Sequence, residues 1–396
     1  MLARIKNLWI YLSYFFLAKK IWSHPSQSEV LIFDSCNQDI LMQFLNPWKP
    51  AVLHVRGEEI NMKVLLKSLF RSGNREDAYV DCFIEKTRPR LVVTFMDNHS
   101  GLHSIAARNP NITTLFLQNG MRNSKIFERL ESRISSGDSL KVNYMMTFGD
   151  YVGTEYAKYI EGCAIPAGSL INNHVPKLKK QQTGVIAFIS QWGDLCDPWK
   201  SYFEQASGLI LQCLVSYAKE NGKKLTIIPR NRKQDNLFRQ EKDFYRGLMG
   251  SEPEFYESKD FCSGYQAVDS AEVVVTLNST LGFESIARGN KTAHFSMRPE
   301  NLGYALHDDV NPVLHGLLGE GLFWTDKPDF DSFIRILGYL FEVDDLQWKK
   351  DVEATNFSSI MFYDPGNKRF KSILEKELGP LPETKNIVTP VQRESV

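Results

Sequence analysis

The residues best suited to chemistry lie where an apolar run meets a helical pattern, between Val273 and Gly289. Val273 to Leu277 are mostly β-branched, and Asn278, Ser279 and Thr280 follow directly. This pattern predicts a strand, a tight turn and a helix N-terminus. Unpaired backbone N–H groups and the positive end of the helix dipole converge there with two hydroxyls, which suits the turn to a phosphate or another anion. The alternative is that Asn278 or Ser279 merely caps the helix.

Two further strand-like runs in the second half of the chain also end in polar residues. Residues 224–228 lead into Arg230, Arg232 and Lys233, and forked guanidinium donors suit phosphate recognition. The neighbouring hydroxyl turn favours Arg230 among the three, although solvated surface charge explains each of them equally well. Residues 184–190 lead into Gln191 and Trp192, a polar and aromatic turn that could take a sugar or base face, unless Trp192 is a core residue.

Carboxylates follow two strand-like runs in the first half. Residues 51–55 run into Arg56, Glu58 and Glu59, and residues 91–95 run into Asp97 and Asn98. A carboxylate facing an enclosed cleft could accept a proton from an attacking hydroxyl. Alternatively, the two glutamates stabilise the N-terminus of a helix expected at residues 60–70, where negative charge interacts favourably with the helix dipole.

Amide and cationic side chains follow a third run in this half, at residues 113–117. Gln118, Asn119 and Arg122 come next. Together with Arg56 and Asn98 they form a lining suited to a polyhydroxylated ligand, although loops are polar in any case.

An alternation of strand-like and helix-like segments along most of the chain predicts the elements that position these residues. The predicted strands are residues 30–33, 51–55, 91–95, 113–117, 142–148, 163–166, 184–190, 224–228, 273–277 and 292–296. Such alternation predicts parallel sheets covered by helices on both faces. The polar, basic stretch at 173–183 interrupts it and is interpreted as a linker. The fold class is therefore α/β, with two doubly wound Rossmann-like domains at 26–172 and 184–345.

Helical patterns at 346–378 follow the second domain, and a proline-rich, charged tail at 379–396 is expected to be disordered. Ligands of open α/β sheets bind at the carboxyl ends of the strands. Two such domains joined by a short linker would bring these ends to one central cleft.

The N-terminal 25 residues are expected to hold a helix of apolar and basic character. Residues 8–18 are nearly all apolar and are flanked by Arg4 and Lys6 on one side and Lys19 and Lys20 on the other. Eleven residues fall short of the ~20 that span a bilayer. Three possibilities stay open: a helix packed on the protein, a helix lying in a membrane interface, and an anchor or signal.

Composition excludes several classes of protein. Lys+Arg and Asp+Glu are each 47, so no bulk charge draws the chain to nucleic acid. The six cysteines have no metal-ligand or disulfide-scaffold spacing, as expected of buried thiols in a reducing cytoplasm. No GxGxxG follows the first strand, and GxxxxGK[ST], GxSxG and HExxH are also missing. With eight scattered histidines, neither a metal site nor a cofactor is predicted.

Several ordered segments between residues 30 and 378 carry a family resemblance. They are FDS (33–35), HVRGEEINMKVLLKSLF (54–70), PRLVVTFMDN (89–98), QNGMR (118–122), TLNSTLGFESIARG (276–289), GLFWT (321–325) and YDPGNKRF (363–370). With these the chain resembles the bacterial surface carbohydrate biosynthesis protein family, which is similar in architecture to two-domain GT-B glycosyltransferases. The resemblance implies a metal-independent enzyme whose last helices, at 346–378, return to the first domain.

The resemblance also implies roles for the candidate residues. The second domain would hold the nucleotide sugar, its phosphate on Ser279 and Thr280 with help from Arg230, Asn278 and Gln191. Glu284, one turn into the helix, would face a ribose or sugar hydroxyl, or else be an exposed helix residue. The first domain would bind the acceptor and supply the base, one of Glu58, Glu59 and Asp97.

The donor stays open between two groups of nucleotide sugars. A hydroxyl turn beside a basic strand end is similar to transferases of CMP-activated ulosonic acids such as Kdo. Their His-Pro motif is replaced here by Pro229-Arg230, so a UDP-, GDP- or dTDP-hexose is the alternative. The expected function is transfer of a sugar to a surface polysaccharide or lipopolysaccharide, in the cytoplasm or at the cytoplasmic face of the inner membrane. A nucleotide-sugar epimerase or hydrolase and a catalytically silent scaffold are the alternatives.

Overall fold

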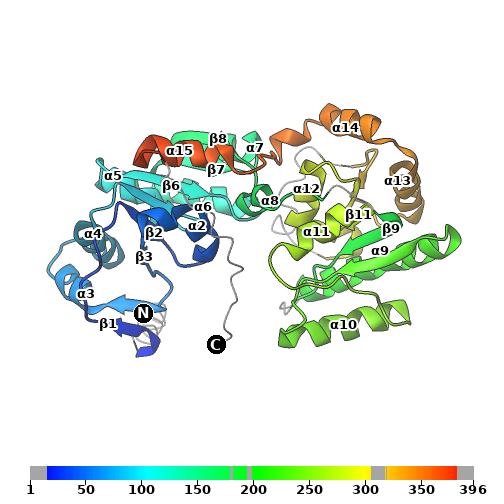
Figure 1. Cartoon of the computed structure of the whole chain (residues 1–396), viewed down its shortest axis with the longest axis horizontal. Coiled ribbons are helices and arrows are strands. Elements are labelled where there is room, and N and C mark those ends of the chain that lie inside the picture. The colour runs from blue at the N-terminus through cyan, green and yellow to red at the C-terminus, as the bar shows by residue number, and fades with distance from the viewer. Residues whose placement is uncertain (1–15, 179–181, 194–198, 305–316, 318, 381–396) are drawn as a thin grey trace.

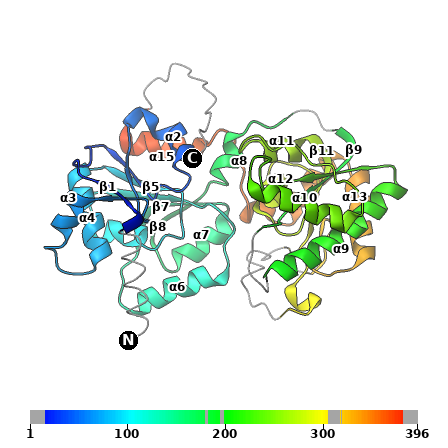
Figure 2. The ribbon, with the colours of Figure 1, turned by 90° about the horizontal axis from the view of Figure 1, so that it is seen from below.

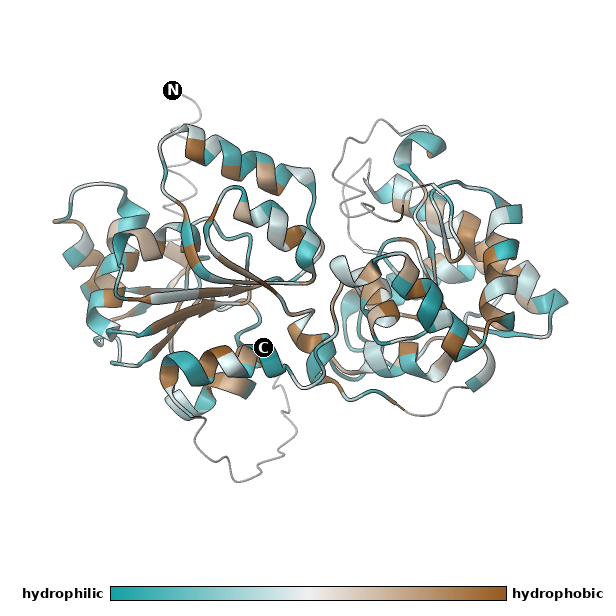
Figure 3. Ribbon diagram, turned by 90° about the horizontal axis from the view of Figure 1, so that it is seen from above, coloured by the Kyte–Doolittle hydropathy of each residue, from teal (hydrophilic) through white to brown (hydrophobic). Residues whose placement is uncertain are grey.

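A computed structural model describes residues 16–178, 182–193, 199–304, 317 and 319–380. These residues form two α/β domains side by side, each with a parallel sheet between helices (Figures 1 and 2). Figure 3 shows the strands as the most hydrophobic ribbons, with helices beside them whose residues alternate between apolar and polar. The predicted fold class, α/β with two doubly wound domains, is confirmed.

The first domain is built on a six-stranded parallel sheet in the order β3-β2-β5-β6-β7-β8. Its strands are β2 (Val30–Phe33), β3 (Ala51–Leu53), β5 (Leu91–Thr94), β6 (Thr113–Leu117), β7 (Lys141–Thr147) and β8 (Glu161–Pro166). Its longer helices are α2 (Gln38–Leu45), α4 (Arg75–Thr87), α6 (Ser124–Ser135) and α7 (Asp150–Ala157), with a short α5 (Ile105–Arg108). Successive strand residues enter opposite cores, so Leu31 and Phe33 pack in one cluster while Val30 and Ile32 pack in the other.

The second domain repeats this plan with five strands in the order β10-β9-β11-β12-β13. These are β9 (Gln182–Ile189), β10 (Lys224–Ile228), β11 (Ala271–Thr276), β12 (Thr292–Phe295) and β13 (Trp324–Thr325). The helices are α9 (Trp199–Glu220), α10 (Asn236–Met249), α11 (Ser263–Ser270), α12 (Thr280–Ala287) and α13 (Phe330–Glu342). The order places the carboxyl ends of β10, β9 and β11 next to one another.

The junction between the domains contains α8 (Leu170–His174) and the segment that follows it, where the linker was predicted. Of the helices expected to return to the first domain, only α15 (Lys368–Leu378) does so. Phe370, Ile373, Leu374 and Leu378 of α15 pack with β2 and β5. The preceding α14 (Asp345–Ala354) stays with the second domain, because Trp348 packs on Phe323 with ring centroids 5.0 Å apart.

The N-terminal region differs from its prediction. Residues 19–21, expected in a helical segment, form β1 (Lys19–Ile21), which pairs in parallel with β4 (Glu59–Asn61). The helix expected at 60–70 therefore begins later, as α3 (Met62–Ser68), with the Asn61 side chain accepting the Val64 N–H. Most of the apolar run at 8–18 and most of the predicted tail lie outside the described residues. Among the residues described, no helix is long and apolar enough to cross a bilayer.

Candidate functional site

The turn between β11 and α12 has the predicted strand, turn and helix geometry. Ser279 is the N-cap residue, with an extended backbone (φ −66°, ψ 141°), yet its side chain accepts no hydrogen bond from the helix. The Ser279 N–H itself donates to Thr276 Oγ1 over 3.1 Å. Capping by the Ser279 hydroxyl, the simpler alternative, is therefore not what the structure contains. The Ser279 hydroxyl lies at the helix N-terminus but accepts no capping hydrogen bond.

Asn278 is held by the neighbouring strand end. Its N–H donates to Gln191 Oε1 over 2.8 Å, and Gln191 Nε2 donates to Asn278 Oδ1 over 2.6 Å. The reciprocal pair joins the ends of β9 and β11 and fixes the turn. Gly282 brings the helix close to the strand, because a Cβ there would lie 2.4 Å from Thr276 Cγ2. Gln191 and Asn278 thus shape the turn that presents Ser279 and Thr280.

A third hydroxyl, which the sequence reasoning overlooked, directly follows the next strand, β12. Thr276 pairs with His294 in the register of β11 and β12, so Ser296 is level with Asn278. The Ser296 side chain is buried and its Oγ has no hydrogen-bond partner among the described residues. Buried hydroxyls are normally bonded, so an unbonded one beside a helix N-terminus marks a place where a polar ligand atom fits. No local pattern in the sequence marks this position, because the register of β11 and β12 defines it.

Arg230 follows β10 and is held by a buried carboxylate that the sequence reasoning also overlooked. Glu241 of α10 accepts the N–H of Arg230 over 2.9 Å and that of Asn231 over 3.0 Å. It also accepts the Ser190 hydroxyl over 2.5 Å. Because these donors come from the ends of β9 and β10, Glu241 draws both loops together. The Arg230 side chain stays exposed, with Nη1 donating to the Gln191 carbonyl over 3.3 Å.

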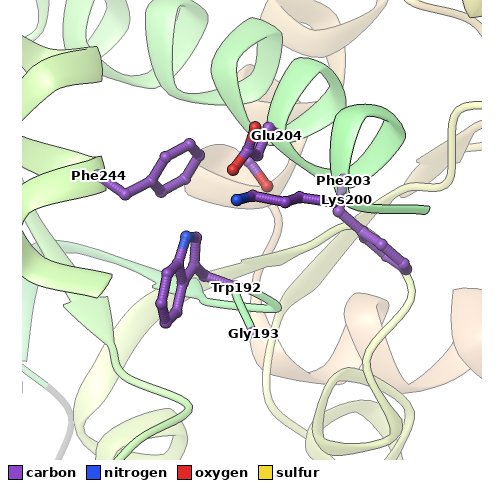
Figure 4. A pocket seen from close by; sticks show the side chains of 7 residues that line it. Trp192, Gly193, Lys200, Phe203, Glu204 and Phe244 are labelled. Carbon is purple, nitrogen blue, oxygen red and sulfur yellow. The ribbon is translucent and has the colours of Figure 1, made fainter. Parts of the chain in front are cut away.

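A small hollow of about 10 Å³, partly open to solvent, lies beside this arginine. Its lining residues are Trp192, Gly193, Lys200, Phe203, Glu204, Ser207 and Phe244. Figure 4 shows the Trp192 and Phe244 rings on one side and the Lys200 and Glu204 side chains reaching toward them from α9. Gly193 permits the approach of Arg230, since a Cβ there would lie 2.8 Å from Nη1. Aromatic faces beside a cation and a carboxylate suit a base or a sugar ring.

Glu284 was expected either to face a ribose or sugar hydroxyl or to be exposed on the helix, and the structure shows neither environment. It is buried, so it is not an exposed helix residue, and it contacts the junction between the domains. Tyr265 donates to Glu284 Oε1 over 3.1 Å, and Ser169, just before α8, is a second hydrogen-bond partner. Burial raises the pKa of Glu284 to about 7. The carboxylate is thus a junction residue and does not face an open donor site.

In the first domain, Glu58 is the exposed carboxylate at the end of β3. Its Oε1 accepts the Ser35 hydroxyl over 3.0 Å and its Oε2 accepts the Arg56 N–H over 3.1 Å. Arg56 in turn forms an ion pair with the buried Asp34, with Nη2 and Oδ2 2.7 Å apart. Glu58 is oriented by two donors and remains accessible from solvent.

Glu59 points elsewhere, because adjacent residues of a strand face opposite sides. It forms an ion pair with Lys19 over 2.8 Å, and His54 Nε2 lies 3.7 Å from its Oε2. It lines a separate hollow under β1 together with Tyr79 and other residues. The structure therefore does not bring the two glutamates into one site.

Asp97 was a candidate base, but the structure buries it completely within an ion pair. Arg122 Nε donates to Oδ2 over 2.6 Å, and Arg122 Nη2 bonds to Oδ1. Tyr156 donates to Oδ2 over 2.7 Å and the Asn119 N–H to Oδ1 over 3.2 Å. Both carboxylate oxygens of Asp97 accept hydrogen bonds and the side chain is fully buried, so Asp97 holds its neighbours in place and is not positioned to accept a proton from a substrate. Arg122, itself buried, is engaged in the same way.

Some of the remaining residues predicted to bind an acceptor form hydrogen bonds within the fold, and others are exposed on the surface. Gln118 is buried and ties two strand ends together: its Oε1 accepts the Phe148 N–H over 2.7 Å and its Nε2 donates to the Gly120 carbonyl over 2.8 Å. The Asn119 side chain donates to Met96 Sδ over 2.8 Å. Asn98 is exposed, as is much of the Arg56 side chain. Of the predicted set in this domain, Glu58, Arg56 and Asn98 are therefore the residues placed to meet a ligand.

The carboxyl edges of the two sheets meet at the domain junction. Phe148, directly after β7, belongs to the same hydrophobic cluster as Phe283 of α12, and Met121 packs against that cluster. The end of β7 in the first domain thus packs into the same hydrophobic core as α12. Among the described residues, no group of three or more His, Cys, Asp and Glu side chains could hold a metal ion.

Three solved structures are similar in outline to the chain. A UDP-GlcNAc 2-epimerase from Neisseria meningitidis, bound to UDP-GlcNAc, is 10% identical, with 88% of this chain and 91% of that chain covered and a TM-score of 0.48. The wall teichoic acid polymerase TagF is 11% identical, with 88% of each chain covered and a TM-score of 0.46. A glycosyltransferase from Rickettsia africae is 10% identical, with 89% and 99% covered and a TM-score of 0.47. Likeness at this level assigns no activity.

No curated protein matches the sequence. One family model does, over residues 115–378, which is more than half of the chain and spans α12, the domain junction and α15. Its description reads "putative O-antigen biosynthesis protein". The chain belongs to this O-antigen biosynthesis protein family.

Proposed function

We propose that the protein transfers a sugar from a nucleotide-sugar donor to a bacterial surface glycan, of the polysaccharide or lipopolysaccharide kind. The observation that carries the proposal is the helix N-terminus of α12, whose Ser279 hydroxyl does not cap it and whose neighbours include the exposed Arg230. Backbone N–H groups, two hydroxyls and a guanidinium form a donor set suited to a phosphate. Membership of an O-antigen biosynthesis family supports the proposal that this phosphate belongs to a nucleotide sugar.

In this proposal the second domain holds the donor. Ser279, Thr280 and Arg230 bind its phosphate, and the Trp192 ring beside the small hollow stacks on the base or the sugar. As the glycosidic bond to the phosphate oxygen breaks, negative charge grows on the leaving nucleotide. The guanidinium and the helix dipole stabilise that charge, and no bound metal takes part.

The first domain supplies the acceptor side. Glu58 removes the proton from the acceptor hydroxyl, and the freed oxygen forms the new bond to the anomeric carbon. Arg56, through its N–H, and Ser35 hold the Glu58 carboxylate in place. Arg56 and Asn98 are the exposed groups beside it that could bind acceptor hydroxyls.

The donor is proposed to be a CMP-activated ulosonic acid such as Kdo, with a UDP-, GDP- or dTDP-hexose as the competitor. A thermal-shift series with CMP, CDP, UDP, GDP and dTDP distinguishes them. A nucleotide held at 100 times its dissociation constant stabilises the folded state by about 2.7 kcal/mol, which raises the melting temperature measurably. No shift with any nucleotide would contradict the proposed donor site.

Incubation with the selected nucleotide sugar, with and without an acceptor glycan, tests the reaction. A transferase consumes the donor only when the acceptor is present. Turnover without acceptor would identify an epimerase or hydrolase. Unchanged biosynthetic function after Glu58→Gln would support a scaffold role instead.

A further inference from the structure

Large apolar side chains are exposed at one end of the first domain. Of the described residues, twelve large hydrophobic side chains are exposed, and six of these lie within residues 16–22 and 66–70. They are Phe16, Leu17, Trp22, Leu66, Leu69 and Phe70. Phe70 is 91% exposed and Leu17 84%. We name this set, together with the lysines and arginines of 16–22 and 62–75, the basic apolar patch.

The fold brings the two segments of the patch together. β1 pairs with β4, Ile21 lies opposite Asn61, and Asn61 caps α3. Trp22 therefore follows β1 at the point where α3 begins. Figures 1 and 2 show β1 and α3 at the end of the first domain that is remote from the second domain. The patch is thus far from the domain junction and from α12.

Exposed apolar side chains lie on α3 and in the turn that follows it. Val64 and Ser68 face the protein and are buried. Lys63, Leu66 and Lys67 share one face of α3 by their spacing of three and four, and all three are exposed. A surface helix normally buries its apolar residues and exposes its polar ones. α3 instead exposes Leu66 between two lysines, and the exposed Leu69 and Phe70 follow in the turn after the helix.

The same segments are basic although the whole chain has no net charge. Residues 16–22 and 62–75 contain Lys19, Lys20, Lys63, Lys67, Arg71 and Arg75 and no acidic residue. Two carboxylates from outside these segments face them: Glu59 pairs with Lys19, and Glu85 pairs with Lys67 and Arg71. The six cations of these two segments outnumber the carboxylates that pair with them in the described contacts, and Glu76 and Asp77 follow only after Arg75.

This combination selects one kind of partner. Leucine and aromatic side chains surrounded by lysine and arginine bind the interface of a bilayer that carries anionic lipids, with the apolar groups at headgroup depth. The chain also reaches the patch at Phe16 directly from the apolar run at 8–18, which Arg4 and Lys6 precede. A partner protein with a buried core would favour fewer lysines, because interface cores are depleted in them.

We propose that the basic apolar patch docks the protein onto the surface of an anionic lipid bilayer. The proposal does not depend on the transfer reaction, because the patch shares no residue with the donor or acceptor groups. Docking would leave α12 and the domain junction away from the lipid. If Glu58 acts on an acceptor, the first domain would be the one nearer to the membrane.

Vesicle sedimentation with the full chain tests the docking. Vesicles of phosphatidylcholine mixed with phosphatidylglycerol are compared with vesicles of phosphatidylcholine alone. We expect binding to the anionic vesicles that weakens at high salt, and a loss of about tenfold or more in partition for the double variant Leu66→Ser with Phe70→Ser. The matched control is Ile334→Ser with Leu346→Ser, which removes two exposed apolar residues from the second domain and should bind as the parent does.

Each alternative outcome overturns the proposal. Unchanged binding of the double variant, with its unfolding temperature preserved, would show that Leu66 and Phe70 do not contact lipid. Equal binding to both vesicle types would show that the basic residues do not select anionic lipid. Self-association that the double variant loses, in sedimentation velocity and without vesicle binding, would make a second copy of the chain the occupant of the patch.

Discussion

At the scale of single residues, two carboxylates at strand ends have opposite surroundings. Asp97 is enclosed by Arg122, Tyr156 and the Asn119 N–H. Glu58 is exposed and accepts only two hydrogen bonds. Both follow an apolar run in the sequence, and local residue types do not separate them. The partners of Asp97 come from positions 22 to 59 residues away, so only the folded chain assigns the roles.

Asp97→Asn tests the structural role. The amide removes the negative charge that compensates the buried Arg122 guanidinium, and a broken buried ion pair costs about 3–5 kcal/mol. We expect a drop of this order in the free energy of unfolding, measured by denaturant titration. The matched variant Glu58→Gln should change stability by less than about 0.5 kcal/mol, because its site is exposed. Equal stability of both variants would refute the distinction.

Glu284 predicts a pH dependence of stability. Burial raises its pKa from 4.5 to about 7, so the folded state favours the protonated form. The stabilisation that this provides is complete below about pH 4.5 and is lost as the pH rises through 7. The difference amounts to about 3 kcal/mol at 1.36 kcal/mol per pKa unit.

The variant Glu284→Gln isolates this contribution. The amide does not titrate, so the stability of the variant relative to the parent should rise between pH 5 and pH 8 by about 2.5 kcal/mol. Denaturant unfolding at the two pH values measures it, and other titrating groups cancel in the difference between parent and variant. Parallel pH profiles would contradict a raised pKa at this position.

At the scale of elements, the sequence predicted most strands within two residues, and the reasons are local. Residues 30–33, 113–117 and 224–228 are apolar runs bounded by polar residues, and β2, β6 and β10 have these limits. β4 was missed because Glu-Ile-Asn has no strand pattern of its own and forms through pairing with β1, 40 residues earlier. Ser296 and Glu241 were missed because register and tertiary hydrogen bonds, rather than local pattern, define their place.

The N-terminus of α12 carries the next prediction. Ser279→Ala combined with Thr280→Ala removes two hydroxyls from the proposed phosphate site while leaving the helix uncapped by Ser279 as before. We expect nucleotide affinity to fall about tenfold or more in calorimetry, since hydrogen bonds to charged groups contribute about 1.5–3 kcal/mol each. Stability should stay close to that of the parent protein.

A control pair removes equivalent hydroxyls from the first domain. Ser136→Ala with Thr154→Ala affects exposed positions beside α6 and on α7. Nucleotide affinity should then match the parent. Should the Ser279 and Thr280 variant also bind as the parent does, α12 would not be the phosphate site.

At the scale of the whole molecule, the domains are held together by groups from distant parts of the chain. Arg288, at the end of α12, donates to the carbonyls of Asn172 and Val175 over 3.0 Å each and pairs with the buried Asp269. The segment that returns from α14 is bonded to the first domain by the Phe362 N–H, which donates to the Phe148 carbonyl over 2.6 Å. The two-domain order followed from the repeated pattern in the sequence, whereas these junction contacts join residues too far apart for any local pattern.

The returning segment depends on glycine where it passes the first domain, and Gly168 gives the last prediction. Gly168 has φ +70°, and a Cβ there would lie 2.2 Å from the Phe362 carbonyl oxygen. Gly366, also in the left-handed region at φ +80°, has open space around its missing Cβ. Gly366→Ala should therefore cost only the backbone term, about 1–2 kcal/mol. Gly168→Ala adds a backbone clash that must displace Phe362, so its unfolding temperature should fall further and small-angle scattering should report a larger radius of gyration. Equal effects of the two substitutions would mean that the close packing of this segment does not fix the arrangement of the domains.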